Sequence, residues 1–364
     1  MKKIRSQAFL DLFADKKVKG SLPSKIRDVV DEPGNLGRER AVLFDRLKSV
    51  DAKSLGKYGP CVIVTEDARI YEKAKGDVTV ILVPDVEEAF WKFVSFYRQL
   101  FQIPVFAVTG TCGKTTTKEM ITHILSKRHH VQATIRSKNS GRFHLPYLLG
   151  IDEETDAAVF EMGVAKPGDV LESSQYFRPT VGVVTNIGVD HLNEFASYGD
   201  YVKAKEEMLA GLGHEGTLVL NADDSNIATF DLTTYRGSIL TFGLGEGADF
   251  VAKEIGAGWG GMEFTLVYQH LAHTLFVPGY GKHNVYNALA AIAAVYAVGI
   301  GIEEAGAALR SYQHLQGHMN VLSGMRGSLV IDDTWNSNPT SVETAIQVLC
   351  DLAKGRKKIV VLGR

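Results

Sequence analysis

The chain has 364 residues, of which 23% are charged, and its formal net charge is −2. This length exceeds one ordinary hydrophobic core, so we expect two or three domains. Lysine and arginine form no block, so the sequence predicts neither a nucleic-acid partner nor a membrane-surface partner. The three cysteines, Cys61, Cys112 and Cys350, form no CxxC pair, which argues against a disulfide framework or a zinc site.

The N-terminus, MKKIRSQAFLDLFADKK, begins with basic residues as a signal peptide does. Its apolar part is short and is interrupted by Asp11 and Asp15, which a signal peptide would not tolerate. No apolar run elsewhere approaches the length of a transmembrane helix. We therefore expect a cytoplasmic protein.

The first hundred residues contain two apolar runs typical of buried strands, CVIVTED from Cys61 and VTVILVPD from Val78. An aromatic-rich segment with helical spacing, VEEAFWKFVSFYRQLF, follows them. We expect residues 1–100 to form a small α/β N-terminal domain.

From Ile103 the pattern alternates strand and helix, with IPVFAVT, KTTTKEMITHIL, DAAVFEM, TVGVVTN and GTLVLN as the clearest segments. Such alternation predicts a mostly parallel sheet with helices on both faces, and ligands bind such sheets at the carboxyl ends of the strands. Residues 238–281 are glycine-rich with short alternating strands, which predicts an antiparallel extension, and the helix NVYNALAAIAAVYAVG follows. We assign residues 101–316 to this central domain.

After Gly317 the α/β pattern restarts with the strand SLVIDD, a helix from Pro339 and a second strand KKIVVLG. We expect residues 317–364 to begin a third domain that is truncated, because two strands leave a parallel sheet with an unpaired edge.

The stretch VFAVTGTCGKTTTKEM, from Val105 to Met120, runs from a strand into a helix through two glycines. Loop N–H groups and a helix N-terminus attract an anion, so this turn predicts a phosphate-binding loop of a shortened P-loop type. Lys114 would reach the outer phosphates and Thr115 would contact Mg²⁺. An ordinary glycine-rich turn is the alternative, and this stretch alone leaves ATP or GTP open.

Two further strand ends carry polar residues. The run AAVFEMG ends in Glu161, which is either a Mg²⁺ ligand or an ordinary carboxylate at a strand end. The run TVGVVTNIGVDHLNEF carries Asn186, Asp190 and His191 but lacks the Asn-Lys-x-Asp pattern that reads guanine. Its absence lowers the case for GTP.

Seven segments resemble the Mur ligase family in order and spacing: GTCGKTTT, FEMGVAKPGDV, VTNIGVDHLNEF, AKEEML, NADD, GKHNVYNALAAIAA and IDDTWNSNPTS. The likeness is strongest to the members that add D-alanyl-D-alanine to a UDP-muramoyl-tripeptide in peptidoglycan precursor synthesis. It implies three domains: a substrate-binding N-terminal domain, an ATPase domain and a Rossmann-like C-terminal domain. It also implies an ATP-dependent amide-bond ligase that forms an acyl phosphate on a carboxylate and then accepts an amine.

The resemblance further implies roles for individual residues. Lys114, Lys205 and His191 would be catalytic. Lys205 stands where the family has a carbamylated lysine, although its local sequence suggests a solvated helical lysine. The metal ligands for Mg²⁺ would be Thr115, Glu161, His191 and Lys205. ATP would be held by Gly110, Thr111, Cys112, Gly113, Lys114, Thr115, Thr116, Asn284, Asn287 and Asp333.

One residue near the third domain departs from the family pattern, because His318 stands where an arginine is expected at the ATP phosphates. Two other hypotheses stay open. The chain could be a related ligase that acts on another carboxylate, of the folylpolyglutamate or poly-γ-glutamate type. It could also be a non-catalytic nucleotide-binding homologue.

Overall fold

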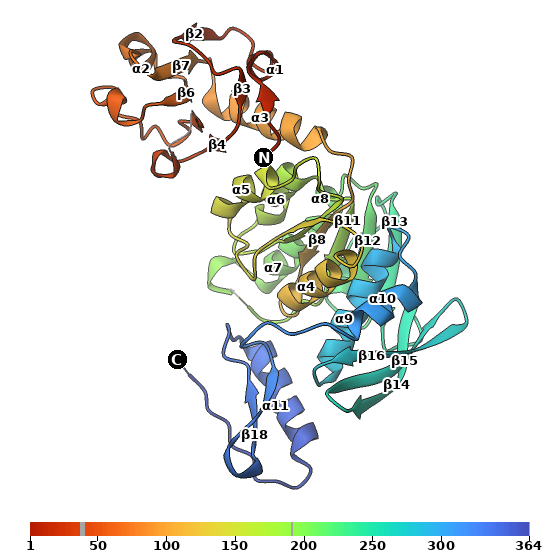
Figure 1. Ribbon diagram of the computed structural model, residues 1–364. Helices are drawn as coiled ribbons and strands as arrows, with labels where there is room; N and C mark the ends of the chain where they lie inside the picture. The colour runs from red at the N-terminus through yellow and green to blue at the C-terminus, as the bar shows by residue number, and fades with distance from the viewer. Residues whose placement is uncertain (37–40, 191, 364) are drawn as a thin grey trace. The chain divides into compact units, whose positions relative to one another are not determined.

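The computed structural model describes residues 1–36, 41–190 and 192–363 (Figure 1). The chain divides into two units by its internal contacts. The first unit contains residues 1–103, 141–155 and 175–177, and the second contains residues 104–140, 156–174 and the chain from 178 onward.

The first unit is built on a five-stranded sheet in the order β2-β7-β6-β5-β4. Strands β4 (Val29–Val30), β5 (Val42–Phe44), β6 (Cys61–Thr65) and β7 (Val78–Leu82) are parallel, and β2 (Lys17–Lys19) is antiparallel to β7. Strands β1 (Ile4–Arg5) and β3 (Lys25–Ile26) form a separate pair. The expected strands at β6 and β7 are confirmed, whereas β2, β4 and β5 are too short to show a pattern in the sequence.

The described part of this unit also contains the helices α1 (Ser6–Leu10), α2 (Ala68–Lys73), α3 (Val86–Gln99) and α5 (His144–Leu149). The aromatic segment expected as a helix is α3, and Asp85 caps it by accepting a hydrogen bond from the Glu88 N–H. Phe90, Phe93 and Tyr97 on α3 are fully buried and pack on other rings of the same unit. Single turns of 3-10 helix occur along the chain at η1 (Pro33–Asn35), η2 (Leu55–Lys57), η3 (Gly141–Phe143), η4 (Leu192–Glu194), η5 (Ile227–Thr229) and η6 (Met325–Gly327).

The second unit contains a nine-stranded sheet in the order β16-β15-β14-β13-β12-β11-β8-β10-β9. The parallel strands are β8 (Val105–Thr109), β9 (Val131–Ala133), β10 (Ala157–Glu161), β11 (Val181–Val184), β12 (Thr217–Asn221), β13 (Ser238–Gly243) and β14 (Phe250–Gly258). Strands β15 (Gly261–Tyr268) and β16 (Leu271–Pro278) are antiparallel. The mostly parallel sheet is thus confirmed.

The antiparallel extension begins later than the sequence predicted. Strand β13 lies within residues 238–281 but pairs in parallel with both β12 and β14. The chain returns from β12 through a crossover, residues 222–237, so β13 must run in the same direction as β12. Only β14, β15 and β16 form the antiparallel ribbon.

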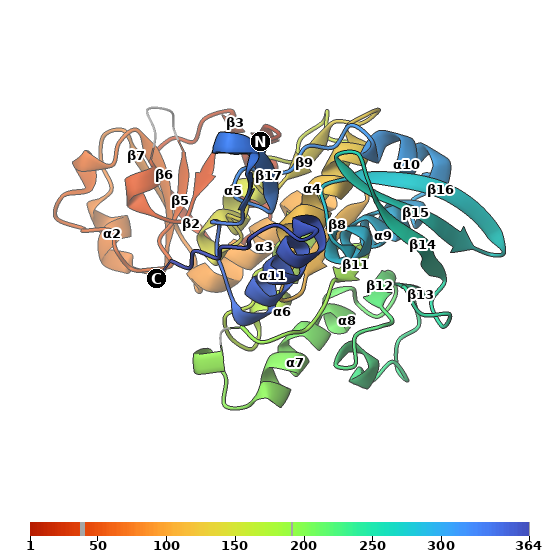
Figure 2. The same ribbon diagram turned by 90° about the horizontal axis from the view of Figure 1, so that it is seen from below.

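Helices cover both faces of this sheet (Figure 2). One face carries α4 (Lys114–Leu125), α9 (Lys282–Tyr296) and α10 (Ile302–Leu309), and the other carries α7 (Tyr198–Glu206) and α8 (Met208–Gly211). Helix α6 (Asp169–Phe177) links parts of the two units in sequence. Two faces covered in this way explain why the central strands are apolar throughout.

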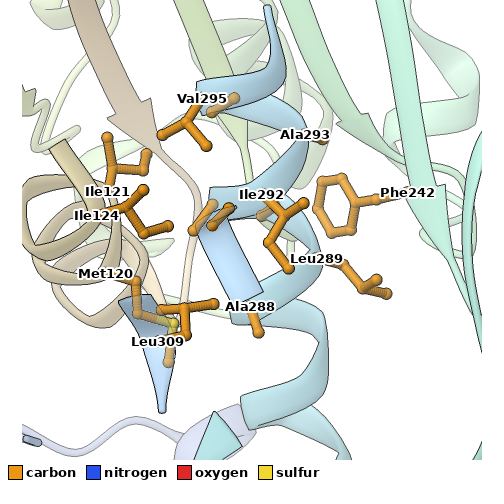
Figure 3. Packing of buried hydrophobic residues seen from close by; sticks show 14 of the residues in the cluster. Met120, Ile121, Ile124, Phe242, Ala288, Leu289, Ile292, Ala293, Val295 and Leu309 are labelled. Atoms are coloured by element: carbon orange, nitrogen blue, oxygen red, sulfur yellow. The ribbon is translucent and has the colours of Figure 1, made fainter. Parts of the chain in front are cut away.

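The main core lies around α9, whose residues 284–285 and 287–295 are buried. Figure 3 shows Ile292 and Val295 of α9 packed near Ile121 and Ile124 of α4, while Phe242 of β13 packs on another side. A helix that is apolar all round belongs inside a protein, and α9 accordingly has neighbours on several sides.

The C-terminal part forms a hairpin and a helix, drawn in blue in Figure 1. Strands β17 (Asn320–Ser323) and β18 (Leu329–Asp332) pair antiparallel, and α11 (Pro339–Ala353) begins where the sequence predicts a helix. The predicted strand KKIVVLG is wrong, because residues 357–363 adopt no regular structure. The described sheet of this part consists of β17 and β18, and residues 357–363 are not paired with it.

In the described ranges, the structure contains no helix that is both long enough and apolar enough to cross a bilayer.

Candidate nucleotide and carboxylate-activation site

The glycines of the predicted phosphate loop occupy positions that no other residue fits. Gly110 follows β8 with φ 143°, and Gly113 precedes α4 with φ 80°. A Cβ atom on Gly110 would lie 2.0 Å from Thr185 Oγ1, and one on Gly113 would lie 2.3 Å from Asn287 Oδ1. The loop therefore packs tightly against its neighbours with its backbone turned as glycine allows.

Asn186, at the end of β11, braces this loop. Its backbone oxygen accepts a hydrogen bond from the Thr111 N–H at 2.8 Å. Its side chain accepts from the Cys112 N–H at 2.9 Å and donates to the Cys112 oxygen at 2.9 Å. The Thr185 hydroxyl donates to the same oxygen at 2.6 Å. The sequence analysis assigned no role to Asn186, and its contacts make it the support of the loop.

Lys114 is the first residue of α4 and is half-buried. Its ammonium donates to the backbone oxygens of Gly110 at 3.0 Å and Thr111 at 2.8 Å, so it lies folded over the loop. Thr116 lies in the same first turn and is also half-buried. Within the described residues no side chain caps the N-terminus of α4, so its N–H groups are free for an anion.

Glu161 ends β10 beside the loop and is buried. One carboxylate oxygen accepts from the Thr115 hydroxyl at 2.8 Å, and the other accepts from the Asn139 amide at 2.7 Å. Its backbone N–H donates to the Thr134 hydroxyl at 3.0 Å. The structure thus joins Thr115 and Glu161 as expected, and their oxygen atoms are the donor type that Mg²⁺ prefers.

Lys205 lies on α7 and only 1% of it is exposed. The alternative that it is a solvated helical lysine is therefore wrong. Burial lowers its pKa well below the usual value, and the charge of Lys114 lowers it further, while Asp190, Asp169 and Glu161 act in the opposite direction. Its nitrogen lies 5.0 Å from the centre of the Tyr201 ring, on the same helix.

The proposed metal ligand His191 lies outside the described residues. Its neighbour Asp190 accepts a hydrogen bond from the Asn338 side chain at 3.3 Å. In the part of the chain that the structure describes, no group of three or more His, Cys, Asp or Glu side chains is arranged to hold a metal. The oxygen pair of Thr115 and Glu161 would thus need water or phosphate oxygens to complete a Mg²⁺ shell.

The two asparagines of α9 occupy different places. Asn287 accepts a hydrogen bond from the Thr117 hydroxyl at 3.4 Å and packs against Gly113, so it lies beside the phosphate loop. Asn284 is buried, and its amide nitrogen donates to the backbone oxygens of Pro278 and Gly279. Among the described residues its side-chain oxygen has no partner, which is an acceptor that an amino group could fill.

Asp333 and His318 lie in the C-terminal hairpin region. The Asp333 carboxylate accepts a hydrogen bond from the Met319 N–H at 3.1 Å, and burial raises the pKa of this carboxyl. Burial lowers the pKa of His318, whose ring lies 6.1 Å from that of Trp335. A cavity of about 230 Å³ lies here, lined by His318, Trp335 and Arg136 among others. Within the described residues Asp333 makes no hydrogen bond to the phosphate loop.

The start of α11 contacts the loop region, which sequence reasoning did not foresee. Asn338 caps α11 and lies 3.4 Å from the Cys112 sulfur, and the Thr340 hydroxyl accepts from the Val189 N–H at 3.3 Å. Burial raises the pKa of the Cys112 thiol. The Asn-Pro pair signals a helix start in the sequence, but no local signal tells what that start will touch.

Comparison with protein families gives one assignment: the Mur ligase middle domain matches residues 108–295. The UDP-N-acetylmuramoyl-tripeptide–D-alanyl-D-alanine ligase of Bacillus subtilis is 34% identical over 285 residues, which cover 78% of this chain and 61% of that protein. The enzyme of the same name from Escherichia coli is 30% identical, with 78% and 63% covered. The chain thus spans less than two thirds of the length of these relatives.

Solved structures show the same fold. MurF from Acinetobacter baumannii matches with a TM-score of 0.82 and 26% identity, covering 98% of this chain and 78% of that one. The MurF ligase of Thermotoga maritima, solved in complex with ADP, matches with a TM-score of 0.73 and 23% identity, covering 89% and 74%. The second likeness concerns the fold alone.

Proposed function

Because the chain belongs to the Mur ligase family, we propose that it is an ATP-dependent amide-bond ligase that activates a carboxylate as an acyl phosphate. We further propose the reaction named in its relatives, the addition of D-alanyl-D-alanine to a UDP-N-acetylmuramoyl-tripeptide. The observation that carries the proposal is the meeting of three strand ends. Strand β8 supplies the phosphate loop, β10 supplies Glu161, and the loop after β11 braces the phosphate loop.

The phosphate loop and the N-terminus of α4 would hold the ATP phosphates through backbone N–H groups. Lys114 would leave the backbone oxygens of Gly110 and Thr111 and pair with the outer phosphates. Asn284, with its unpartnered side-chain oxygen, offers an acceptor for the adenine amino group. Asn287 supports the turn by filling the space beside Gly113.

Thr115 and Glu161 would hold Mg²⁺, which when bound offsets the negative charge of the phosphates. Asn139 fixes one Glu161 oxygen and the Thr134 hydroxyl fixes its backbone N–H, so the carboxylate is oriented before any ligand arrives. His191 is proposed as a ligand of a second ion from the family pattern.

Lys205 would act as a carbamate. Its burial favours the neutral amine, the form whose nitrogen attacks the carbon of CO₂. The nitrogen then loses a proton, and the product is an anionic carbamate. An anion suits a place beside a metal better than the ammonium that the sequence alone would put there.

In the proposed reaction an oxygen of the acceptor carboxylate attacks the γ-phosphorus of ATP, and ADP leaves. The amine then attacks the acyl carbon, loses a proton, and expels phosphate with the oxygen that joined the two. Lys114 and the loop N–H groups stabilise the charge that develops on the transferred phosphoryl group. Activation is needed because a free carboxylate is a poor electrophile.

The test is phosphate release by the purified chain with MgATP. UDP-muramoyl-tripeptide, a folate and a glutamyl peptide are compared as acceptors, each with and without D-alanyl-D-alanine or glutamate. We expect release that requires the muramoyl tripeptide and D-alanyl-D-alanine together. If phosphate were released with the folate or the glutamyl peptide but not with the muramoyl tripeptide, that compound would replace the tripeptide as the proposed acceptor. If the chain bound ATP but released phosphate with none of the acceptor and amine pairs, the ligase activity itself would be contradicted.

A further inference from the structure

The hydroxyl of Thr111, in the phosphate loop, is engaged by protein groups outside the loop. It accepts a hydrogen bond from the Gly188 N–H at 2.9 Å and lies 2.8 Å from the Tyr201 hydroxyl. Gly188 belongs to the loop after β11, and Tyr201 belongs to α7. The Thr111 oxygen thus joins three segments that are far apart in the sequence.

The side chain of Tyr201 is buried and closely packed. Only 1% of it is exposed, and its ring packs edge-on against Phe195 at 5.2 Å between centres. Lys205 lies one helical turn further along α7, with its nitrogen 5.0 Å from the centre of the same ring. One side chain therefore touches the phosphate loop with its hydroxyl and Lys205 with its ring.

We propose that Tyr201 is a positioning residue that holds the phosphate loop and Lys205 at a fixed separation. The proposal rests on the proposed function, because it assumes that Lys205 takes part in turnover. Tyr201 is 1% exposed, so it is proposed to act through its neighbours and not by contact with a substrate. It acts through Thr111 on one side and through Lys205 on the other.

Two features of the contact favour this role over simple packing. In the described structure the hydroxyls of Tyr201 and Thr111 form a buried polar link between α7 and the phosphate loop. The loop has its own support from Asn186, so it does not need Tyr201 to keep its shape. The bond to Tyr201 adds a link to α7, the helix that carries Lys205. Small displacements of a catalytic group lower rates strongly even when binding survives.

The test compares Tyr201→Phe with Tyr235→Phe in the full chain. Both changes remove a tyrosine hydroxyl and keep the ring, and the Tyr235 hydroxyl donates to the Gly216 oxygen at 2.8 Å. The measurements are kcat for phosphate release with acceptor and amine, the Kd for ATP, and the melting temperature. We expect Tyr201→Phe to lower kcat about fivefold while the Kd for ATP changes less than about twofold. Tyr235→Phe should leave kcat unchanged at a similar loss of melting temperature.

A double-mutant cycle makes the test specific to the hydroxyl pair. Thr111→Val removes the partner hydroxyl, and Thr111→Ser keeps it. If the two hydroxyls act as one unit, the Tyr201→Phe/Thr111→Val double variant is no slower than Thr111→Val alone, and Thr111→Ser keeps most of the rate. Additive losses would overturn the proposal, and so would equal kcat values for Tyr201→Phe and Tyr235→Phe. A wild-type chain that releases no phosphate with any acceptor would overturn the proposed function, and this inference with it.

Discussion

Two regions of the central sheet differ in what they bury: the carboxyl ends of the parallel strands and the ribbon β14 to β16. At the carboxyl ends of β8, β10 and β11, the polar residues Thr111, Glu161 and Thr185 are each 3% exposed. Each side chain has hydrogen-bond partners: Tyr201 for Thr111, Thr115 for Glu161, and the Cys112 oxygen for Thr185. In the ribbon β14 to β16, the inward residues are apolar, and Phe264 and Leu266 of β15 pack into the core around α9.

This contrast separates chemistry from stability. Buried polar groups add little net stability because they lose water as they gain partners, so a cluster of them signals a binding site. The apolar side of the ribbon removes much surface from water and contributes to stability. Changes at the strand ends should therefore alter turnover more than folding, and changes in the ribbon should do the reverse.

The largest expected effect is that of Lys114→Ala. We expect turnover to fall about 1,000-fold, and ATP binding to weaken strongly, because the phosphates lose their nearest cation. The melting temperature should change little, since in the described structure the lysine donates to two loop oxygens that water can satisfy. Lys127→Ala, near the other end of α4, is the matched control and should keep full activity. An unchanged ATP affinity in Lys114→Ala would remove the phosphate-loop assignment.

Lys205→Ala should be the next largest effect, lowering turnover about 100-fold while ATP binding is weakened far less. The loss of stability should be smaller than for a buried apolar residue, because removal of a buried amine offsets part of the cost of the cavity. Small carboxylates added to the buffer should partly restore turnover by occupying the anionic position.

Lys203→Ala is the control for Lys205→Ala, since Lys203 lies on the same helix and is exposed. Activity and melting temperature should both stay at the wild-type level in this control. Full ligase activity in Lys205→Ala would contradict its role as a carbamate.

In the ribbon, Phe264→Ala should lower the free energy of unfolding by about 3 to 5 kcal/mol, because it leaves a cavity in the core. The rate per folded molecule should stay close to that of the wild type. Chemical denaturation, with activity measured at a temperature where the variant is folded, checks both points. If kcat fell by a larger factor than the folded fraction, the ribbon would affect turnover as well as stability, and the contrast between the two regions would fail.

The buried His283, at the start of α9, should make the free energy of unfolding depend on pH. Burial, helped by the charge of His314, lowers its pKa to about 4, and its Nδ1 atom is buried without a partner among the described residues. Between its ordinary pKa of about 6.5 and pH 4, the unfolded chain binds a proton that the folded chain does not. Stability should therefore fall as the pH falls through this window, by less than about 1.4 kcal/mol per pH unit.

The slope should be smaller in His283→Gln, which cannot take up the proton, and unchanged in His270→Gln, whose side chain is exposed. Denaturant midpoints measured every half unit of pH provide the comparison. Identical slopes for all three proteins would show that His283 does not titrate in this window.

The smallest expected effect is that of Trp259→Ser at the tip of the ribbon. Trp259 is 97% exposed, so its loss should change the free energy of unfolding by no more than about 0.5 kcal/mol. Turnover should not change either. A large change in the free energy of unfolding or in turnover would mean that the ribbon tip belongs to the functional site.

The sequence predicted best what depends on local pattern. The strand, glycine turn and helix from Val105 onward have a spacing that leaves few alternatives, and the end of β10 at Glu161 follows from a short apolar run. The parallel sheet follows from the alternation of strands and helices, and only the start of its antiparallel part was misplaced, because β13 carries no signal for its direction.

The remaining features depend on contacts between distant segments. The burial of Lys205 depends on how α7 packs, and a charged helix segment gives no sign of this. The support from Asn186 and the contact of Asn338 with Cys112 join residues 74 and 226 positions apart. Residues 357–363 are apolar enough for a strand, but in the described structure they pair with no strand.

Activation of the carboxylate as an acyl phosphate is tested most directly by following one oxygen atom of the acceptor. UDP-muramoyl-tripeptide is prepared with ¹⁸O in its acceptor carboxylate, and the chain is supplied with MgATP and D-alanyl-D-alanine. If the carboxylate is activated as an acyl phosphate, each released phosphate carries one ¹⁸O from the acceptor. Amide formation with phosphate that lacks the label would contradict the central claim.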